Sequence, residues 1–375
     1  MPILNKTQLR KIRKVALDGH KWAGILAAIP ILILASTGLI LVFESELRAF
    51  EEREAFFVDV PEGASEARLS IQEQVDRALE AYPDLKVSSY SLPKAPDEAA
   101  MIRLSNRHTL FVDPYTGEVR KDTPRPAPIM RAIRVLHTSF FLGDFGTWIA
   151  IISSFAFILL SATGAVLFFK RRGNLLRQSK ITFDKGANRR DFDLHAVIGF
   201  YAAGFLSLIA LSGALIGIGQ PWREFILNVT QSEWAARPKL SEPLSASTPL
   251  LAMDVLLEAV NAVAPEKLEP TTIFMPREAD APVLVRYTYP WARRPASLGY
   301  IHPATGAILD FHHFPEYEAG HLIHRLNRGF HSGEIFTVGM RWLWWVLMLI
   351  TLMLIITGYF IWRTRRKKQP QVAQS

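Results

Sequence analysis

Four long apolar stretches constrain the fold of this chain more than any other feature. Each is long enough to cross the hydrocarbon core of a bilayer as a helix, which takes about 20 residues. A polar segment at about 44–147 lies between the first and second stretches, and another at about 219–341 lies between the third and fourth. The sequence therefore predicts an α-helical membrane protein in which four spans alternate with soluble modules. The apolar stretches run from Trp22 to Phe43, Trp148 to Phe169, Ala196 to Ile218 and Trp342 to Trp362.

The basic residues predict how the spans are oriented. They gather at 6–21, before the first stretch, at 170–190, after the second, and at 363–368, after the fourth. Segments rich in Lys and Arg stay on the cytoplasmic side of a membrane. We therefore expect both termini to be cytoplasmic and both polar segments to be extracytoplasmic. Because the net charge of +8 is concentrated beside apolar runs, it indicates contact with a lipid bilayer and no nucleic acid partner.

The lack of cysteine removes several redox and catalytic chemistries. With no cysteine in the chain, disulfides, thiolate catalysis, iron–sulfur clusters and thioether-linked haem are excluded. A Gly-x-Gly-x-x-Gly segment between a strand and a helix is also missing, so no nicotinamide or flavin domain is visible. A redox centre would need other ligands and an external electron donor.

Repeated motifs predict a tandem duplication. Arg131-x2-Arg134-x2-His137 recurs as Arg325-x2-Arg328-x2-His331, and a tryptophan follows each copy at the same interval. The shared orientation of both copies implies a parallel 2+2 repeat about an axis along the membrane normal. Further echoes are Asp18-x-His20-x3-Gly24 with Asp193-x-His195-x3-Gly199, and the small pairs Thr37-Gly38, Thr163-Gly164, Ser212-Gly213 and Thr357-Gly358.

Each polar segment also carries the pattern of a small α+β module. Helical spacing of apolar residues at 70–82 and 250–263 precedes alternating strand patterns. Those strands are expected at 101–104, 108–113, 283–289 and 299–302, and a Pro-x-Thr-Gly turn in each module leads into one more strand.

These patterns divide the chain into eight parts. They are an N-terminus with the first span (1–43), module 1 (44–130), the His137 segment with the second span (131–172), a cytoplasmic loop (173–193), the third span (194–218), module 2 (219–320), the His331 segment with the fourth span (321–364) and a cytoplasmic tail (365–375).

The motifs around the four repeated histidines, the Thr-Gly pairs and the Pro-x-Thr-Gly turns resemble the PepSY-associated transmembrane family of bacterial inner-membrane proteins. The resemblance covers nearly the whole chain. Within the family, the chain is most similar to ferric-siderophore or iron-uptake reductases. The resemblance implies PepSY-like periplasmic modules, haem held in the helices, and reduction of an extracytoplasmic iron complex during iron uptake. Fold resemblance by itself does not identify the substrate.

The histidines support haem binding independently of that resemblance. His20 and His195 lie at the cytoplasmic mouths of their spans, whereas His137 and His331 precede spans at the opposite edge. Two imidazoles at equal depth can hold a haem iron axially inside a helical bundle. We therefore predict two b-type haems. If the segments are helical, Arg134 and Arg328 lie one turn from their histidines and can pair with haem propionates.

Simpler interpretations remain for each feature. A lone histidine at a membrane boundary is usually an interfacial residue, and the Thr-Gly pairs can be ordinary packing sites between spans. Asp18 and Asp193 are expected to be helix N-caps. His324 is the substitute should His137 or His331 not be a ligand. A metal or ferric-complex site is left open by a cluster of His312, His313, His321 and His324 with Glu316 and Glu318 nearby.

Three functions follow from these alternatives. The favoured one is a haem-dependent oxidoreductase that takes electrons from a cytoplasmic or quinone donor and reduces Fe(III) in a siderophore or another iron complex. The acceptor is expected to dock where the modules meet the outer haem, but the sequence does not identify its contacts. The second function is a haem-free, membrane-anchored binding or regulatory protein. The third is a proton-coupled transporter that uses the histidines as a relay.

Overall fold

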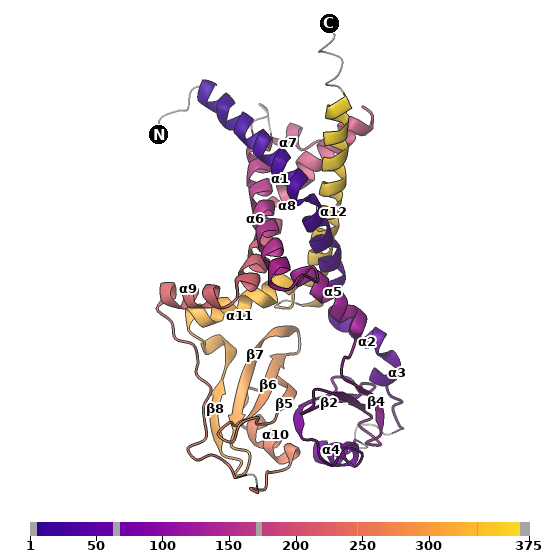
Figure 1. Ribbon diagram of the computed structural model, residues 1–375, viewed down its shortest axis with the longest axis vertical. Coiled ribbons are helices and arrows are strands. Elements are labelled where there is room, and N and C mark those ends of the chain that lie inside the picture. Colours follow the sequence, from indigo (N-terminus) through magenta and orange to yellow (C-terminus); the bar gives the residue numbers. More distant parts are fainter. Residues whose placement is uncertain (1–5, 63–67, 170–174, 246, 336, 368–375) are drawn as a thin grey trace.

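The computed structural model describes residues 6–62, 68–169, 175–245, 247–335 and 337–367. Four helices in this part of the chain are long and apolar enough to cross a membrane, which confirms the predicted spans. Both α1 and α8 pack against α6 and against α12, so α1 and α8 lie on a diagonal of the bundle. The four are α1 (Lys6–Leu41), α6 (Gly143–Phe169), α8 (Ala187–Ile218) and α12 (Val338–Lys367) (Figure 1).

The first and third spanning helices begin well before their apolar stretches. Because α1 begins at Lys6 and α8 at Ala187, Asp18 and Asp193 lie inside helices, and the prediction that they are N-caps was wrong. Lysine and arginine favour helix, so the basic segments extend the helices beyond the apolar core. Asp193 is buried and accepts hydrogen bonds from the Arg189 side chain at 2.8 Å and from the Thr182 main chain at 3.3 Å.

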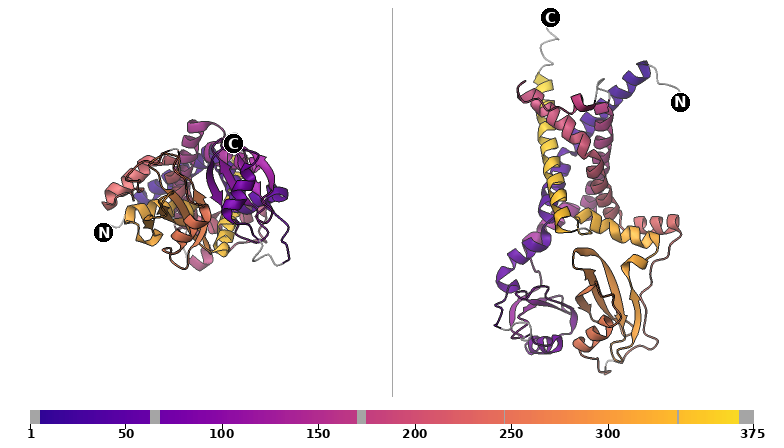
Figure 2. Two further views of the ribbon diagram at one scale, coloured as in Figure 1. Left: turned by 90° about the horizontal axis from the view of Figure 1, so that it is seen from below. Right: turned by 180° about the vertical axis from the view of Figure 1, so that it is seen from behind.

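Some of the basic residues used to predict the orientation of the spans lie outside the described residues. They are Lys170, Arg171, Arg172 and Lys368. The N-terminal end of α1 and the C-terminal end of α12 lie at one end of the bundle, and the strands lie at the other (Figure 2). The α7 helix (Leu175–Gln178) lies at the first of these ends (Figure 1).

Short helices connect the bundle to the strands. Before α6 lies α5 (Pro128–Ser139), which packs on α1 and α6, and before α12 lies α11 (Ala319–Ser332), which packs on α8 and α9. Figure 1 shows α9 (Gln220–Thr230) and α11 running across the base of the bundle. The remaining short helices are α2 (Glu44–Glu51), α3 (Arg53–Phe56) and the 3₁₀ turn η1 (Phe314–Glu316).

The strands of both modules form one antiparallel sheet in the order β4-β3-β2-β1-β5-β6-β7-β8. The modules are joined where β1 pairs with β5, with Tyr90 opposite Ile273. Neither of these two strands was predicted, because both are short and rich in Ser, Thr or Pro. The strands are β1 (Val87–Ser91), β2 (Ala100–Leu104), β3 (Thr109–Val112), β4 (Val119–Thr123), β5 (Glu269–Phe274), β6 (Val283–Tyr289), β7 (Ala292–Ile301) and β8 (Ile308–His312).

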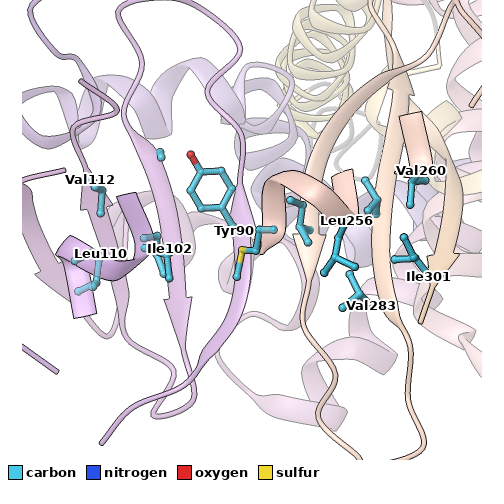
Figure 3. Close-up of a cluster of buried hydrophobic side chains, with 14 of the residues drawn as sticks. Tyr90, Ile102, Leu110, Val112, Leu256, Val260, Val283 and Ile301 are labelled. Carbon is cyan, nitrogen blue, oxygen red and sulfur yellow. The ribbon is translucent and has the colours of Figure 1, made fainter. Parts of the chain in front are cut away.

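One hydrophobic core extends across both modules. The α4 helix (Ile71–Leu79) and the α10 helix (Met253–Asn261) lie close to the predicted helical segments and pack on the joined sheet. Buried side chains from the two halves form a single cluster, including Tyr90 of β1 and Leu256 of α10 (Figure 3). Burial of this apolar surface holds the modules together as one unit.

Candidate functional site: two histidine pairs and an adjoining cavity

The inner histidine pair lies across the diagonal of the bundle. His20 comes from α1 and His195 from α8, and their ring centroids are 6.1 Å apart. The Nδ1 of His20 lies 3.1 Å from the carbonyl oxygen of Leu160 and 3.0 Å from the Thr163 hydroxyl, both on α6. Because a carbonyl can only accept, Nδ1 carries the proton and donates it. The Nε2 atom of His20 is therefore left with a free lone pair.

His195 is held in the same way by α12. Its Nδ1 donates to the carbonyl of Leu354 at 3.1 Å, and the Thr357 hydroxyl lies 3.1 Å from the same nitrogen. The Thr357 hydroxyl donates in turn to the Met353 carbonyl at 2.8 Å, so its oxygen can accept from the imidazole. Both rings of the inner pair thus have one fixed orientation and one fixed tautomer.

The outer histidine pair lies at the other end of the bundle, on the short helices α5 and α11. The ring centroids of His137 and His331 are also 6.1 Å apart. The Nδ1 of His331 donates to the Ile209 carbonyl at 3.1 Å, with the Ser212 hydroxyl at 3.1 Å. The Nδ1 of His137 lies 2.8 Å from the Thr37 hydroxyl on α1.

The glycine of each small pair leaves room for a histidine. At Gly213 an added Cβ would lie 2.7 Å from Cε1 of His331, which is too close for a real contact, and at Gly38 it would lie 3.4 Å from Cε1 of His137. The repeated Thr-Gly and Ser-Gly pairs therefore contact the imidazoles directly.

The spacing of both pairs would allow a metal ion to be held between the two imidazoles. With metal–nitrogen bonds of about 2.0–2.1 Å, two axial imidazoles have centroids about 6 Å apart. Both observed separations are 6.1 Å. In the described parts of the chain, Nε2 of each of the four histidines has no hydrogen-bond partner. Neutral imidazoles with a free Nε2 at this spacing could hold a haem iron, with His20 and His195 serving one site and His137 and His331 the other.

The two pairs are separated by most of the thickness of a bilayer. On α1, His20 belongs to the inner pair, and Thr37 is hydrogen-bonded to the outer pair. The helical rise puts these two residues about 25 Å apart along the axis. The hydrocarbon core is about 30 Å thick, so one pair lies near each of its faces.

The two arginines predicted to meet haem propionates differ in their partners. Arg134 forms an ion pair with Glu44, with Nε 3.0 Å from Oε1. Arg328 has no ion pair or side-chain hydrogen bond among the described residues. Burial lowers the pKa of Arg328, and the nearby guanidinium of Arg294 lowers this pKa further. Arg328 is therefore available to an anion beside the outer pair.

Comparison with known proteins identifies the family. Residues 17–365 match the family model described as the PepSY-associated TM region, a stretch that includes both histidine pairs and both modules. The chain belongs to the PepSY-associated transmembrane family. This confirms the predicted membership. An uncharacterized protein of Pseudomonas aeruginosa is 32% identical to this PepSY-associated protein over 92 residues, which are 24% of this chain and 23% of that relative.

The cluster of four further histidines near α11 does not form a metal site. Across the described residues, no group of three or more His, Asp or Glu side chains is placed to hold a metal ion. The side chains face different partners. His312 contacts Asp310 at 2.7 Å and His313 contacts Glu316 at 3.3 Å, whereas Glu318 accepts from a main-chain N–H.

His321 and His324 occupy the aromatic side of α11. His321 stacks between Trp234 and Tyr317, with centroid distances of 3.8 and 4.0 Å, and accepts a hydrogen bond from Arg325 at 2.8 Å. His324 packs edge-on against Trp234, and its buried Nδ1 has no partner in the described structure. The substitute ligand named from the sequence thus contacts Trp234 and lines a cavity, and no contact with His137 or His331 is found among the described side chains.

The sequence predicted a docking place where the modules meet the outer haem, but it predicted neither this cavity nor the residues that line it. The cavity has a volume of about 810 Å³ and lies between α11 and the sheet. Its basic side chains come from positions far apart in the sequence, so no local pattern could have revealed it. They are Arg237, Lys239, Arg277, Arg286, Arg294, Arg325 and Arg328.

Proposed function

We propose that this PepSY-associated protein is a haem-dependent oxidoreductase of the bacterial inner membrane. It holds one b-type haem at each histidine pair and carries electrons from a cytoplasmic or quinol donor to an extracytoplasmic iron complex. The proposal rests on the pairing of two imidazoles at each end of one bundle, with 6.1 Å between ring centroids in each pair.

The chain's own residues prepare each pair for a metal. A hydrogen bond from Nδ1 to a main-chain carbonyl fixes the ring and makes Nε2 a better ligand. For His20 that carbonyl belongs to Leu160, and for His331 it belongs to Ile209. Bound between such imidazoles, haem iron would supply one-electron carriage between its ferric and ferrous states. Arg328 would hold a haem propionate at the outer pair, and Arg134 would do so through the N–H groups that Glu44 does not use.

The acceptor best suited to this arrangement is Fe(III) in a siderophore. A siderophore binds Fe(III) through hard oxygen ligands, and the gain of one electron gives Fe(II), which such ligands hold less strongly. The electron comes from the external donor, so the reaction balances as one donor electron for each Fe(III) reduced. The released Fe(II) would be the product available for uptake.

The tandem 2+2 repeat is part of the same proposal. His20 on α1 is held by α6 through Thr163, and His195 on α8 is held by α12 through Thr357. The strand order is also symmetric about the β1–β5 pair. A repeat of this kind places two equivalent ligands at each depth, which is what axial coordination needs.

Optical spectra of the full-length protein, purified from membranes, test the haem assignment. We expect a Soret band, visible bands that sharpen on reduction, and two haems per chain by pyridine haemochrome assay. His20→Ala or His195→Ala should each remove one haem, and His137→Ala or His331→Ala the other. As a control, His108→Ala changes a half-buried residue of module 1 that is paired with Asp122 and should keep both haems.

Other results would point to the alternative functions. Colourless protein from haem-sufficient cells would contradict the proposal and favour a haem-free regulatory protein or a proton-coupled transporter. Retention of two haems in all four histidine variants would refute the ligand assignment. For the substrate, the chemically reduced protein should be reoxidised by a ferric siderophore while a ferrous-specific chelator captures Fe(II). Reoxidation without captured Fe(II) would contradict iron reduction.

A further inference from the structure

The cavity beneath α11 lies where the two modules meet the base of the bundle. The strands β5, β6 and β7 form one wall, and α11 forms another. Ser88 of module 1 lines it beside module 2 residues such as Phe274. Arg328 lines it as well and lies one helical turn before His331 on α11. The cavity therefore adjoins the outer histidine pair.

The positive charges in this cavity are not balanced. Lys239 pairs with Asp280 at 2.6 Å, and Arg294 pairs with Glu334 at 3.0 Å. In the structure as described, the other arginine side chains have no carboxylate or hydrogen-bond partner, except Arg325, which donates to His321. The guanidinium groups without such a partner are those of Arg237, Arg277, Arg286 and Arg328. Under the proposed function Arg328 would pair with a haem propionate, which leaves the other three guanidinium groups for a further anion.

These cations also lie close enough to repel one another. Burial lowers the pKa of Arg286, and the neighbouring Arg294 and Arg325 lower it further. Like charges gathered in a concave surface of low dielectric produce a strong positive potential. An anion that enters the cavity would relieve this repulsion and occupy the free guanidinium donors.

Aromatic side chains define the shape of the matching ligand. The Arg286 guanidinium lies 4.9 Å from the centroid of Phe274, and that of Arg325 lies 5.7 Å from the centroid of Trp234. Such pairs present flat apolar surfaces next to cationic donors, which suits an anionic ring better than a hydrated inorganic ion. The volume of about 810 Å³ is in the range of sites for small organic ligands.

We propose that this cavity is the docking site for a small, negatively charged iron chelate whose metal is held by catecholate, phenolate or carboxylate oxygens. The identity of the ligand as an iron complex rests on the proposed function, whereas its negative charge and aromatic character rest on the cavity. The site discriminates against neutral and cationic chelates of the same size. It holds the bound complex beside Arg328, one helical turn from His331.

The phosphate of an anionic lipid headgroup is an alternative ligand for the same guanidinium groups. The soluble chelate is favoured because the walls include strand residues of both modules, such as Ser88 and Arg286, which lie on the sheet and not on a spanning helix. A membrane-bound phosphate would have to leave the bilayer surface to reach them.

Binding of redox-inert chelates to the full-length protein tests this proposal. The protein is placed in nanodiscs of zwitterionic lipid and titrated calorimetrically with the Ga(III) complex of a tripodal tris(catecholate), of charge 3−. The comparison ligand is a neutral Ga(III) tris(hydroxamate) of similar size. We expect binding of the anionic complex that weakens as salt is raised, and no measurable binding of the neutral complex.

Arginine variants locate the site. Arg277→Gln and Arg286→Gln should each weaken binding of the anionic complex about tenfold, because each removes a charged hydrogen-bond donor. Arg125→Gln changes an exposed arginine of module 1 outside the cavity and should bind as the wild type does. Arg286 lies on a central strand, so thermal unfolding is measured in parallel, and Arg277, outside the strands, serves as the independent variant.

Several results would overturn the anion site. They are equal binding of the two complexes, unchanged binding in Arg277→Gln and Arg286→Gln, or retained anionic lipid that the tris(catecholate) complex fails to displace. Because gallium is not reduced, binding does not depend on haem. Charge-selective binding by a protein without haem would leave the site standing and refute the proposed function. A protein with two haems but no charge-selective binding would leave the proposed function standing and refute the anion site.

Discussion

At the residue scale, a small pair on one helix holds a histidine that belongs to another. Ser212 lies 3.1 Å from Nδ1 of His331, and the neighbouring Gly213 leaves space for the ring. The hydroxyl determines the tautomer together with a carbonyl, while the absent side chain permits the close approach. A substitution at one of these small residues can therefore displace the histidine ring without changing the histidine itself.

Gly213→Ala should remove the outer haem. The new Cβ would lie 2.7 Å from Cε1 of His331, so the ring must move away from its partner. We expect the pyridine haemochrome assay to fall from about two haems per chain to about one, with the inner haem retained. Gly204→Ala is the matched control on α8, because a Cβ there meets nothing within 4 Å. Equal haem content in the two variants would contradict the role of Gly213 in leaving space for the His331 ring.

His321 makes the packing of α11 against module 2 depend on pH. Burial lowers the pKa of His321 to about 4, and the Arg325 guanidinium contributes to the same shift. The unfolded chain, with a histidine pKa near 6.5, binds more protons than the folded one between about pH 6.5 and 4. This contribution to stability is present above pH 6.5 and is lost as the pH falls toward 4.

His321→Gln should reduce that loss. We expect the apparent Tm of the wild type to fall more between pH 6.5 and 4.5 than the Tm of the variant, as followed by differential scanning fluorimetry of the purified full-length protein. The variant should be less stable at pH 7.5, because it loses the stacking between Trp234 and Tyr317. Parallel Tm profiles in this window would exclude His321 as the titrating group.

At the element scale, the helices of the two modules cap each other. The Asp254 carboxylate at the start of α10 accepts from the N–H groups of Ile71 and Gln72 at 2.7 and 2.8 Å, at the start of α4. The Gln72 side chain accepts in return from the N–H of Met253 at 3.2 Å. This exchange satisfies free N–H groups at both helix starts and ties the modules together beside the β1–β5 pair.

Asp254→Ala should destabilise the joined sheet by about 1 kcal/mol, the usual cost of losing a capping side chain. Its removal leaves two N–H groups of α4 without their acceptor. The change is measured as a shift in urea or thermal unfolding of the extramembrane part, followed by tryptophan fluorescence. Glu258→Ala, an exposed change on the same helix, is the control. Equal stability of the two variants would mean that the cap contributes nothing.

At the scale of the whole molecule, one bundle carries a histidine pair at each end and a joined sheet at only one end. Electrons crossing the membrane along this bundle would emerge beside the cavity between α11 and the sheet. The outward face of the bundle is apolar, with Leu26 77% and Ile29 70% exposed, as expected for contact with lipid. The proposed direction of transfer requires the sheet to lie outside the cytoplasm.

Single-cysteine labelling can determine this orientation, because the chain contains no cysteine of its own. In intact spheroplasts, a membrane-impermeant maleimide should label Arg125→Cys in module 1 and Glu258→Cys in module 2. Lys185→Cys, at the other end of the bundle, should be labelled only after the membrane is permeabilised. All three are exposed positions. Labelling of Lys185→Cys alone in intact spheroplasts would reverse the topology.

The sequence by itself determined the spans, the family and the four histidines of the proposed sites. Membrane spans are visible locally because lipid requires unbroken apolar helices. The repeat placed His20 with His195 and His137 with His331 by symmetry of position, and the structure brings both pairs together. Helix starts were less visible, since Lys and Arg extend α1 and α8 past Asp18 and Asp193 without an apolar signal.

Only the tertiary structure decided how the modules join and where the charges gather. The β1 and β5 strands carry weak patterns, and their pairing depends on surfaces that fit only when both modules are folded. The cavity collects arginines from positions 237 to 328, which local periodicity cannot relate. Long-range contacts of this kind are set by packing and charge in three dimensions, whereas spans and motifs are set by residues adjacent in the chain.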